Sequence, residues 1–213
     1  MTSAMITFYY CYPTCAMASH LALEESGLPY QPVLANIYDE GERARYLEIN
    51  PKGTVPAITV EGELVTENVA ILTYVGRLAP ASGLLPEDPW EAARCLSFLA
   101  WCSSSVHVAF RQSFRPERFT PDAAAHQSLR DVGRAAYWKA LQAMDARVAD
   151  QPYMMGDRFT VADCYPLVFY NWGLIADYPV TELPHLRAFK DRMIARPAVR
   201  RVLDREGCPL LPG

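Results

Sequence analysis

The stretch Tyr10-Cys11-Tyr12-Pro13-Thr14-Cys15-Ala16 joins two segments of different pattern, and the expected fold is organised around it. Residues 5–9 before it are apolar, β-branched and aromatic, which predicts a short buried strand. Residues 16–26 after it follow the helical period and precede Gly27, which predicts a helix closed by a left-handed residue. Cys15 is therefore expected where a strand passes into a helix.

The position of Cys15 makes it a candidate reactive cysteine. A thiol at a helix start meets backbone N–H groups and the positive end of the helix dipole, and both favour the thiolate. The alternative is an inert core residue, because free cysteine is among the residue types most often buried. Three residues separate Cys11 from Cys15, so the redox C-x-x-C motif is absent.

The composition is that of an ordinary globular protein with a sizeable core. Of 213 residues, 51% are hydrophobic and 21% are charged, and the formal net charge is −4. The sequence has no long run of charge and no apolar stretch near the ~20 residues of a membrane span. Neither nucleic acid nor a membrane is therefore expected as a partner. Residues 1–4 do not begin a signal-peptide pattern, so we expect a cytoplasmic protein.

The cysteines and histidines do not predict a metal site. None of the six cysteines and four histidines forms a cluster with metal-ligand spacing. Cys95, Cys102 and Cys164 fall in apolar helical patterns and are expected in the core. In a reducing compartment no disulfide is expected.

The first part of the chain predicts an α/β domain in the order strand, helix, strand, helix, strand, strand, helix. Beyond the first two elements, strands are expected at residues 30–37, 57–60 and 64–66, and helices at 42–49 and 67–78. A split β-α-β unit followed by β-β-α gives a mixed sheet. We set this domain at residues 4–80.

The rest of the chain predicts a linker and then an all-helical domain. Residues 79–89 hold three prolines and a glycine without any period, which is typical of a linker, set at 81–89. The helical domain is expected to span residues 90–208. Its helices are expected at residues 90–114, 122–148, about 160–173, 183–195 and 198–204. In the second of these, one apolar stripe is expected along Leu129, Val132, Ala136, Leu141, Met144 and Val148. Thr160 and Asp163 have the spacing of a capping box.

Two short segments of the first domain could hold a peptide. If the Val55–Pro56 bond is cis, the backbone N–H and C=O of Val55 can pair with an extended ligand. At the expected helix start, free N–H groups near Asn68 can bind a carboxylate, and Glu67 can hold an ammonium group. The alternative for Glu67 and Asn68 is an ordinary capped helix.

His107 also has two interpretations. Its neighbours are largely apolar, so it is either a satisfied core residue or a group that faces Cys15 across a domain cleft. In the second case it could orient or polarise a thiol.

Together these segments resemble the soluble glutathione transferases, and most closely the bacterial beta class. The resemblance covers almost the whole chain, as a thioredoxin-like domain followed by an all-helical domain. It is carried by five segments in the family's order: Cys15-Ala16-Met17-Ala18-Ser19-His20, Asn50-Pro51-Lys52-Gly53-Thr54-Val55-Pro56-Ala57, Glu67-Asn68-Val69-Ala70-Ile71-Leu72, Ser104-Ser105-Val106-His107 and Thr160-Val161-Ala162-Asp163.

The resemblance implies how glutathione, a co-substrate, would lie on the first domain. Val55 would pair with its cysteinyl backbone beside cis-Pro56, and Glu67 and Asn68 would hold its γ-glutamyl end. Cys15 would face its sulfur and could form a mixed disulfide with it.

The resemblance also assigns residues around the cleft. His107 matches the cleft histidine of the class, and Ser104 and Ser105 are expected near the ligand. Three positions depart from the class: Tyr38 falls near its glycine-end lysine, Ala100 replaces its usual asparagine, and Ala16 replaces a serine after the cysteine.

Several nearby side chains are rivals for the catalytic role. Other transferase classes use a Tyr or Ser hydroxyl against the glutathione thiolate, and here Tyr9, Tyr10, Tyr12 and Cys11 lie close in sequence. Tyr9 and Tyr10 alternate sides on a strand, so only one can face the ligand, and both can be packing residues. We rank Cys15 first, Tyr10 second and Cys11 third.

The resemblance implies a glutathione transferase that conjugates glutathione to hydrophobic electrophiles, with monothiol disulfide exchange through Cys15 as a second reaction. The electrophile would lie near His107, Phe110, Arg111, Phe114 and Trp172. A homodimer is implied by the resemblance alone. The alternatives are a non-catalytic regulatory protein of the same fold that binds a protein partner, and a specialised glutathione-dependent lyase, isomerase or dehalogenase.

Overall fold

The computed structural model describes residues 5–211 of the chain. Residues 1–4, where no signal peptide is expected and the first predicted domain begins, lie outside the described residues. The strands are β1 (Ile6–Tyr10), β2 (Tyr30–Leu34), β3 (Ala57–Val60) and β4 (Glu63–Thr66). The α-helices are α1 (Ala16–Ser26), α2 (Glu40–Leu47), α3 (Asn68–Leu78), α4 (Pro89–Trp101), α5 (His107–Phe114), α6 (His126–Arg147), α7 (Cys164–Ile175), α8 (Pro184–Ile194) and α9 (Pro197–Glu206).

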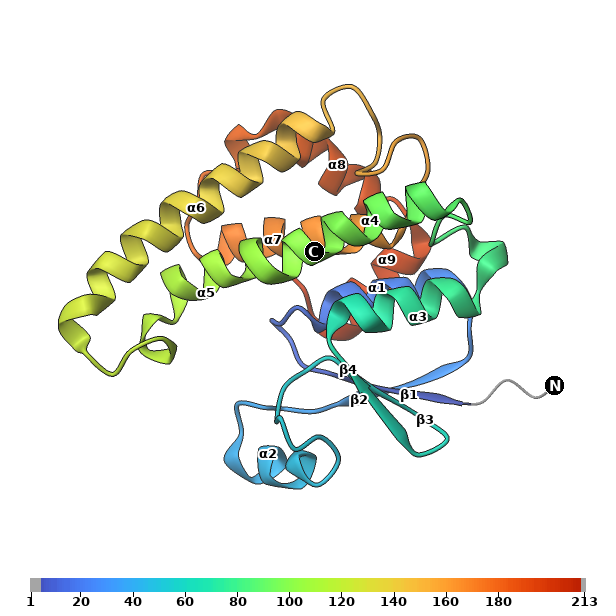
Figure 1. Cartoon of the computed structure of the whole chain (residues 1–213), viewed down its shortest axis with the longest axis horizontal. Helices are drawn as coiled ribbons and strands as arrows, with labels where there is room; N and C mark the ends of the chain where they lie inside the picture. Colours follow the sequence, from blue (N-terminus) through green and yellow to red (C-terminus); the bar gives the residue numbers. More distant parts are fainter. Residues whose placement is uncertain (1–4, 212–213) are drawn as a thin grey trace.

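The strands form one mixed sheet in the order β2-β1-β3-β4. β1 runs parallel to β2 and antiparallel to β3, and β4 returns antiparallel to β3. α1 and α3 lie along one face of the sheet, and α2 lies beyond the other (Figure 1). The alternation of β1 fits these layers, because Phe8 and Tyr10 are buried toward α1 while Tyr9 packs on Tyr46 of α2. The predicted element order of this part is confirmed.

Some predicted boundaries in the sheet region are wrong, each for a local reason. The second strand ends at Leu34 rather than residue 37, because its partner β1 ends at Tyr10 and only Ala35 N–H still reaches the Tyr10 carbonyl, at 2.8 Å. The second helix begins at Glu40 rather than residue 42. Asp39 caps it by accepting a hydrogen bond from Glu42 N–H.

The helical part departs from the prediction in its details. The expected helix at 90–114 is α4 and α5 joined by a π-helical turn at Cys102–Val106, and together they form one long rod (Figure 1). The linker contains a 3₁₀ turn at Pro80–Ser82. The helix at 122–148 is α6 preceded by a 3₁₀ turn at Ala123–Ala125.

The apolar stripe predicted for α6 is partly wrong. Val132 is 61% exposed and Ala136 is exposed, whereas Gly133 and Tyr137 are buried. The reason is the close approach of α5, because a Cβ at Gly133 would lie 2.6 Å from Ser113 N. The absence of a side chain at Gly133 therefore allows α5 to pack closely on this face of α6.

α7 is the central helix of the second part. Its residues from Cys164 to Gly173 are all buried, so it has no polar face. The predicted capping box at its start is confirmed, since Thr160 N–H donates to the Asp163 carboxylate at 2.8 Å and the Thr160 side chain accepts from Ala162 N–H. Cys95, Cys102 and Cys164 are buried as expected.

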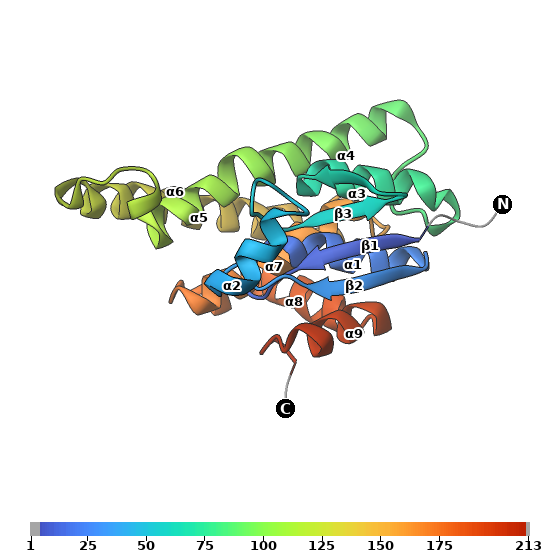
Figure 2. The same ribbon diagram turned by 90° about the horizontal axis from the view of Figure 1, so that it is seen from below.

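The end of the chain packs against its beginning. α9 lies against α1, and the chain returns to the first domain through it (Figure 2). His20 of α1 lies 2.6 Å from Glu206 of α9, and both side chains are fully buried. No helix among residues 5–211 is both long and apolar enough to span a membrane.

Candidate functional site

The start of α1 presents Cys15 at the edge of the first domain. The Cys15 carbonyl accepts from Ala18 N–H at 3.1 Å, and the side-chain amide of Asn68 donates to it at 2.9 Å. Its thiol sulfur lies 3.8 Å from the Val55 carbonyl oxygen, and the side chain is partly buried. Residues 40 positions apart therefore meet where the sequence predicts a thiol site.

The predicted preference of Cys15 for the thiolate is wrong for the ligand-free chain. The pKa of its thiol is raised to about 12, mainly by burial and to a smaller extent by the carboxylate of Glu67. A hydrogen bond to the thiol from its own backbone N–H, the Asn68 side chain and the positive charge of Arg111 lower the pKa, but less than burial raises it. The helix start does act in the expected direction, and desolvation outweighs it.

The Val55 backbone lies beside this thiol and outside the sheet. The Val55–Pro56 bond is cis, and so is Tyr12–Pro13. Pairing of β3 with β1 begins only at Ala57, so the strand ladder does not use the Val55 carbonyl. Val55 is thus placed next to Cys15.

A buried asparagine that the sequence analysis missed holds the loop before Val55. The Asn50 side chain donates to the Thr54 carbonyl at 2.7 Å and accepts from Lys52 N–H at 3.1 Å. The Tyr46 hydroxyl also donates to the Thr54 carbonyl, at 2.9 Å. An asparagine directly before a Pro-x-Gly loop was the available signal, because such side chains commonly bond the backbone of a turn.

The start of α3 differs from the prediction for Asn68. Its side chain is buried, and its oxygen accepts from the Ser19 hydroxyl at 2.6 Å while its amide holds Cys15. This side chain ties α3 to α1. At the start of α3, the groups that can bind an anion are therefore the backbone N–H groups.

Glu67 is exposed and paired with a lysine that the sequence analysis did not select. Lys52 Nζ lies 3.1 Å from Glu67 Oε1 and donates to the Thr66 hydroxyl at 3.0 Å. Glu67 has a positive φ of 73°, a conformation uncommon for this residue type. An acid and a base thus stand side by side above the start of α3.

α5 and α7 build an aromatic wall in the second domain. The His107 ring lies edge-on to Trp172 at 4.9 Å, and Phe110 stacks on Trp172 at 4.6 Å and on Phe114 at 5.3 Å. The pKa of His107 is lowered to about 4, mainly by burial and to a smaller extent by the charge of Arg111, so the ring is neutral at pH 7.

Arg111 connects this wall to the thiol. Its guanidinium is close enough to Cys15 and to His107 to shift the pKa of both groups. Tyr165 of α7, also missed from sequence, lies near Asn68, Ser103 and Cys15, and burial raises the pKa of its hydroxyl. The second domain therefore faces Cys15 with aromatic and cationic groups.

The structure does not bring the rival residues to the Cys15 sulfur. The Tyr10 ring lies 4.9 Å from the His20 ring, on the side of α1 that meets Glu206 and Arg205. The Tyr12 hydroxyl accepts from the Asn171 amide at 3.2 Å, and Cys11 is buried.

The remaining predicted residues lie at the surface. Ser104 and Ser105 are exposed on the π-helical turn, and the Ser104 hydroxyl donates to the Ala100 carbonyl at 2.8 Å. Tyr38 is 53% exposed, and it is close enough to Cys11 and Cys15 for those groups to raise its pKa. Within residues 5–211 no group of three or more His, Cys, Asp or Glu side chains is arranged to hold a metal ion.

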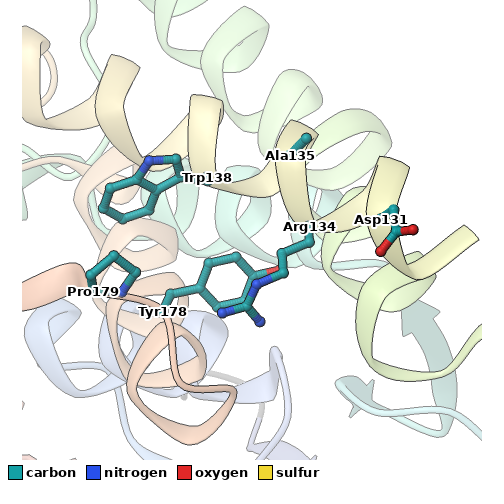
Figure 3. A pocket seen from close by; sticks show the side chains of 6 residues that line it. All are labelled: Asp131, Arg134, Ala135, Trp138, Tyr178 and Pro179. Atoms are coloured by element: carbon teal, nitrogen blue, oxygen red, sulfur yellow. The ribbon is translucent and has the colours of Figure 1, made fainter. Parts of the chain in front are cut away.

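Two surface pockets lie away from Cys15. One of about 360 Å³ is formed by α6 and the loop after α7, where the Arg134 guanidinium lies across the Tyr178 ring at 4.3 Å (Figure 3). Another of about 700 Å³ lies between α4 and α6 and includes Trp90, which is 72% exposed. Neither contains a residue predicted for the site.

Comparisons with known proteins match both parts of the chain. Residues 14–78 match the family described as glutathione S-transferase, N-terminal domain, and residues 107–197 match its C-terminal domain. Glutathione S-transferase GstA of Escherichia coli O157:H7 is 32% identical, over 93% of this chain and 98% of that protein. Maleylacetoacetate isomerase of Pseudomonas aeruginosa is 30% identical, over 92% of this chain and 94% of that protein.

Solved structures give the same result. A Sulfitobacter glutathione transferase homologue with bound glutathione has a TM-score of 0.87 and 32% identity, covering 96% of this chain and 99% of that one. A beta-class glutathione S-transferase of Sphingomonas chungbukensis has a TM-score of 0.84 and 31% identity, covering 95% and 99%. With both domains matched in order over nearly its whole length, the chain belongs to the glutathione S-transferase family of enzymes.

Proposed function

We propose that this chain binds glutathione beside Cys15 and conjugates its sulfur to a hydrophobic electrophile. The observation that carries the proposal is the approach of the Cys15 sulfur to the Val55 carbonyl, 3.8 Å away, where the backbone takes no part in the sheet. An extended peptide can pair there as an added strand. The exposed Glu67 and the start of α3 then suit an amino-acid end of that peptide.

The charges around the site indicate how the thiolate would be stabilised. Burial keeps Cys15 protonated and His107 neutral, so neither supplies a charge at pH 7. N–H groups at the start of α1 and the guanidinium of Arg111 are the groups left to stabilise the anion of a bound thiol. In conjugation that sulfur attacks the electrophilic carbon, the C–S bond forms, and the leaving group departs with its electron pair.

The first test is calorimetric titration with glutathione, followed by turnover of glutathione and chlorodinitrobenzene. Glu67→Gln should weaken glutathione binding about tenfold, because it removes one charged hydrogen-bonding partner. Glu63→Gln, an exposed change on β4, is the matched control and should leave the affinity unchanged. No heat on titration of the unmodified chain would contradict the proposal.

A second reaction, monothiol disulfide exchange, is supported by the position of Cys15 beside the same backbone. Its thiolate would attack one sulfur of oxidised glutathione, form a protein–glutathione disulfide and release the other glutathione as a thiol. Mass spectrometry after treatment with oxidised glutathione should show one adduct that Cys15→Ala loses. An unchanged mass, or an adduct that persists in Cys15→Ala, would remove Cys15 from this role.

The isomerase alternative is favoured by one relative, the maleylacetoacetate isomerase that is 30% identical. An isomerase would return glutathione unchanged, whereas a transferase consumes it. Measuring free thiol during turnover separates the two. Retention on immobilised glutathione without any turnover would instead favour the non-catalytic, protein-binding alternative.

A homodimer and a cytoplasmic location complete the proposal. Membership of the family supports the dimer, and the groove between α4 and α6 with its exposed Trp90 is the candidate surface. Light scattering should give twice the mass of the 23.9 kDa chain. A monomeric mass at micromolar concentration would contradict the dimer, and recovery in the membrane fraction would contradict the location.

A further inference from the structure

Asn171 is a polar residue inside the central buried helix of the second domain. α7 is buried from Cys164 to Gly173, and Asn171 is only 1% exposed. Its side-chain amide donates a hydrogen bond to the Tyr12 hydroxyl at 3.2 Å. Its side-chain oxygen is buried and has no hydrogen-bond partner among the described residues. A buried oxygen without a partner costs stability, so packing alone does not account for an asparagine at this position.

Tyr12 belongs to the thiol loop, residues 11–15, which joins β1 to α1. The loop is closed by the Thr14 hydroxyl, which donates to the Cys11 carbonyl and accepts from Ala16 N–H at 3.2 Å. It ends at Cys15, the residue that precedes the first turn of α1. The hydrogen bond from α7 to Tyr12 therefore links the loop that presents Cys15 to the helical domain.

Asn171 also stands directly before the residue at the centre of the aromatic wall. Trp172 stacks on Phe110 at 4.6 Å and lies edge-on to the His107 ring at 4.9 Å. One turn of α7 thus carries both a ring of the wall and the hydrogen bond to the thiol loop. A shift of α7 relative to the thiol loop would move the wall relative to the thiol.

Most other hydrogen bonds between side chains of the two domains lie farther along α1. His20 is bonded to Glu206, and Glu25 is bonded to Arg196. These bonds join the middle and the C-terminal end of α1 to α9 and its cap. They fix one part of the contact between the domains, whereas the bond to Tyr12 lies at the end of the contact that carries the thiol loop.

We propose that Asn171 is a positioning residue for the reaction: through its hydrogen bond with Tyr12 it sets the spacing between the thiol loop and the aromatic wall. This inference rests on the proposed glutathione conjugation, in which one domain binds the sulfur and the other binds the electrophile. Reacting atoms must approach to about 3–3.5 Å, so a small change in this spacing changes the rate. Glutathione binding, which the proposed function assigns to Val55 and Glu67 of the first domain, does not depend on it.

The experiment removes each end of the hydrogen bond with little change in shape. Asn171→Leu replaces the amide by an apolar side chain of similar size, and Tyr12→Phe removes only the hydroxyl. In each variant kcat with glutathione and chlorodinitrobenzene should fall on the order of tenfold. The Kd for glutathione, measured by calorimetry, should be unchanged. Because both changes break the same bond, the double variant should lose no more activity than the weaker of the two single variants.

A second measurement needs no conjugation. If the spacing widens, the Cys15 thiol is less desolvated and a larger fraction of it is thiolate. The rate of Cys15 alkylation by iodoacetamide at a fixed pH should therefore rise about three- to tenfold in Asn171→Leu and in Tyr12→Phe, the factor equivalent to one neutral hydrogen bond.

Stability and a matched variant separate positioning from a general loss of structure. The urea midpoint of the double variant should be unchanged, since both partners of the bond and the unpaired oxygen are then removed. Tyr153→Phe is the control, because its partly buried hydroxyl accepts a hydrogen bond from Arg196 at 3.3 Å. That change should alter neither kcat nor the alkylation rate.

Three outcomes overturn the inference while leaving glutathione conjugation intact. The first is an unchanged kcat and alkylation rate in both single variants. The second is a pair of losses that multiply in the double variant, which would mean that the two residues act separately. The third is a lower urea midpoint in the double variant that accounts for the lost activity. If the unmodified chain gives no heat with glutathione, the proposed function is overturned instead, and the alkylation rates alone decide whether Asn171 sets the spacing at Cys15.

Discussion

The two ends of α1 are held in opposite ways. From its middle to its C-terminus, buried or partly buried charges join it to α9 and the cap of α9: His20 lies 2.6 Å from Glu206, and Glu25 forms two hydrogen bonds with Arg196 at 2.6 and 2.8 Å. At its N-terminal end, no ion pair of the described residues involves Cys15, whose sulfur lies 3.8 Å from the Val55 carbonyl oxygen. The thiol end of the helix is therefore held by uncharged contacts, whereas charged pairs fix the rest of the helix.

Asn68 contacts α1 between these two regions. It is the first helical residue of α3, yet its side chain is only 5% exposed and forms hydrogen bonds with both the Ser19 hydroxyl and the Cys15 carbonyl. The backbone of Cys15 is thus fixed although its side chain is not. The comparison indicates that Cys15 is positioned through hydrogen bonds to its backbone carbonyl rather than through contacts to its sulfur.

The largest expected effect is at the anchored end. His20→Ala should lower the free energy of unfolding by about 3–5 kcal/mol, because it leaves the Glu206 carboxylate buried without its nearest partner. It also removes a ring packed 4.9 Å from both Phe8 and Tyr10. Urea unfolding followed by circular dichroism measures the change. His185→Ala, exposed on α8, should change stability by less than about 0.5 kcal/mol, and equal losses in the two variants would refute the distinction.

A smaller effect is expected at the junction. Asn68→Ala should cost about 1–3 kcal/mol, since it leaves the Ser19 hydroxyl without its acceptor and the Cys15 carbonyl with only its bond from Ala18 N–H. Ser19→Ala removes one of the two bonds and should cost about half as much. Chemical unfolding gives both values. If Ser19→Ala lowered stability more than Asn68→Ala, the hydrogen bond from Asn68 to the Cys15 carbonyl would not be what fixes the N-terminal end of α1.

The elements of the fold were predictable because they depend on local pattern. A run of apolar, β-branched and aromatic residues predicted β1 one residue early at each end, and Gly27 with the helical period predicted the full extent of α1. The face of α6 was not predictable, since Val132 and Gly133 are neighbours on a helix and only the position of α5 decides which is buried. Packing partners distant in sequence carry that information.

The candidate site divides in the same way. Cys15, Val55 and Glu67 could be selected from motifs, because each stands at an element boundary that the sequence marks. The role of Asn68 could not, since its partner carbonyl lies 53 residues away. The protonation of Cys15 was predicted with the wrong sign, because the helix dipole is visible in sequence and the burial that outweighs it is not.

A modest effect on stability is expected at the partly exposed ion pair between Arg196 and Glu25. Arg196→Gln should cost about 1 kcal/mol, because its pair with Glu25 is partly buried and its guanidinium also lies 4.1 Å from the Phe159 ring. Arg201→Gln removes a more exposed cation and should change stability by less than about 0.5 kcal/mol. Thermal unfolding of the two variants compares them directly. Indistinguishable unfolding midpoints would show that the contribution of these ion pairs to stability does not depend on their burial.

The smallest effect on stability, and the sharpest test of the open end, concerns Cys15 itself. Because burial raises its pKa to about 12 and alkylation requires the thiolate, the rate with iodoacetamide should be low at neutral pH. It should then rise about tenfold for each pH unit between about pH 7 and pH 9, without levelling off. Peptide mass mapping follows the Cys15 adduct specifically, and Cys15→Ser, with unfolding free energy within about 0.5 kcal/mol of the parent, provides the blank. A rate that levels off below about pH 8 would mean that the N–H groups and dipole at the start of α1 outweigh desolvation after all. In that case the free enzyme would already carry a thiolate, and the site would be prepared for disulfide exchange before glutathione arrives.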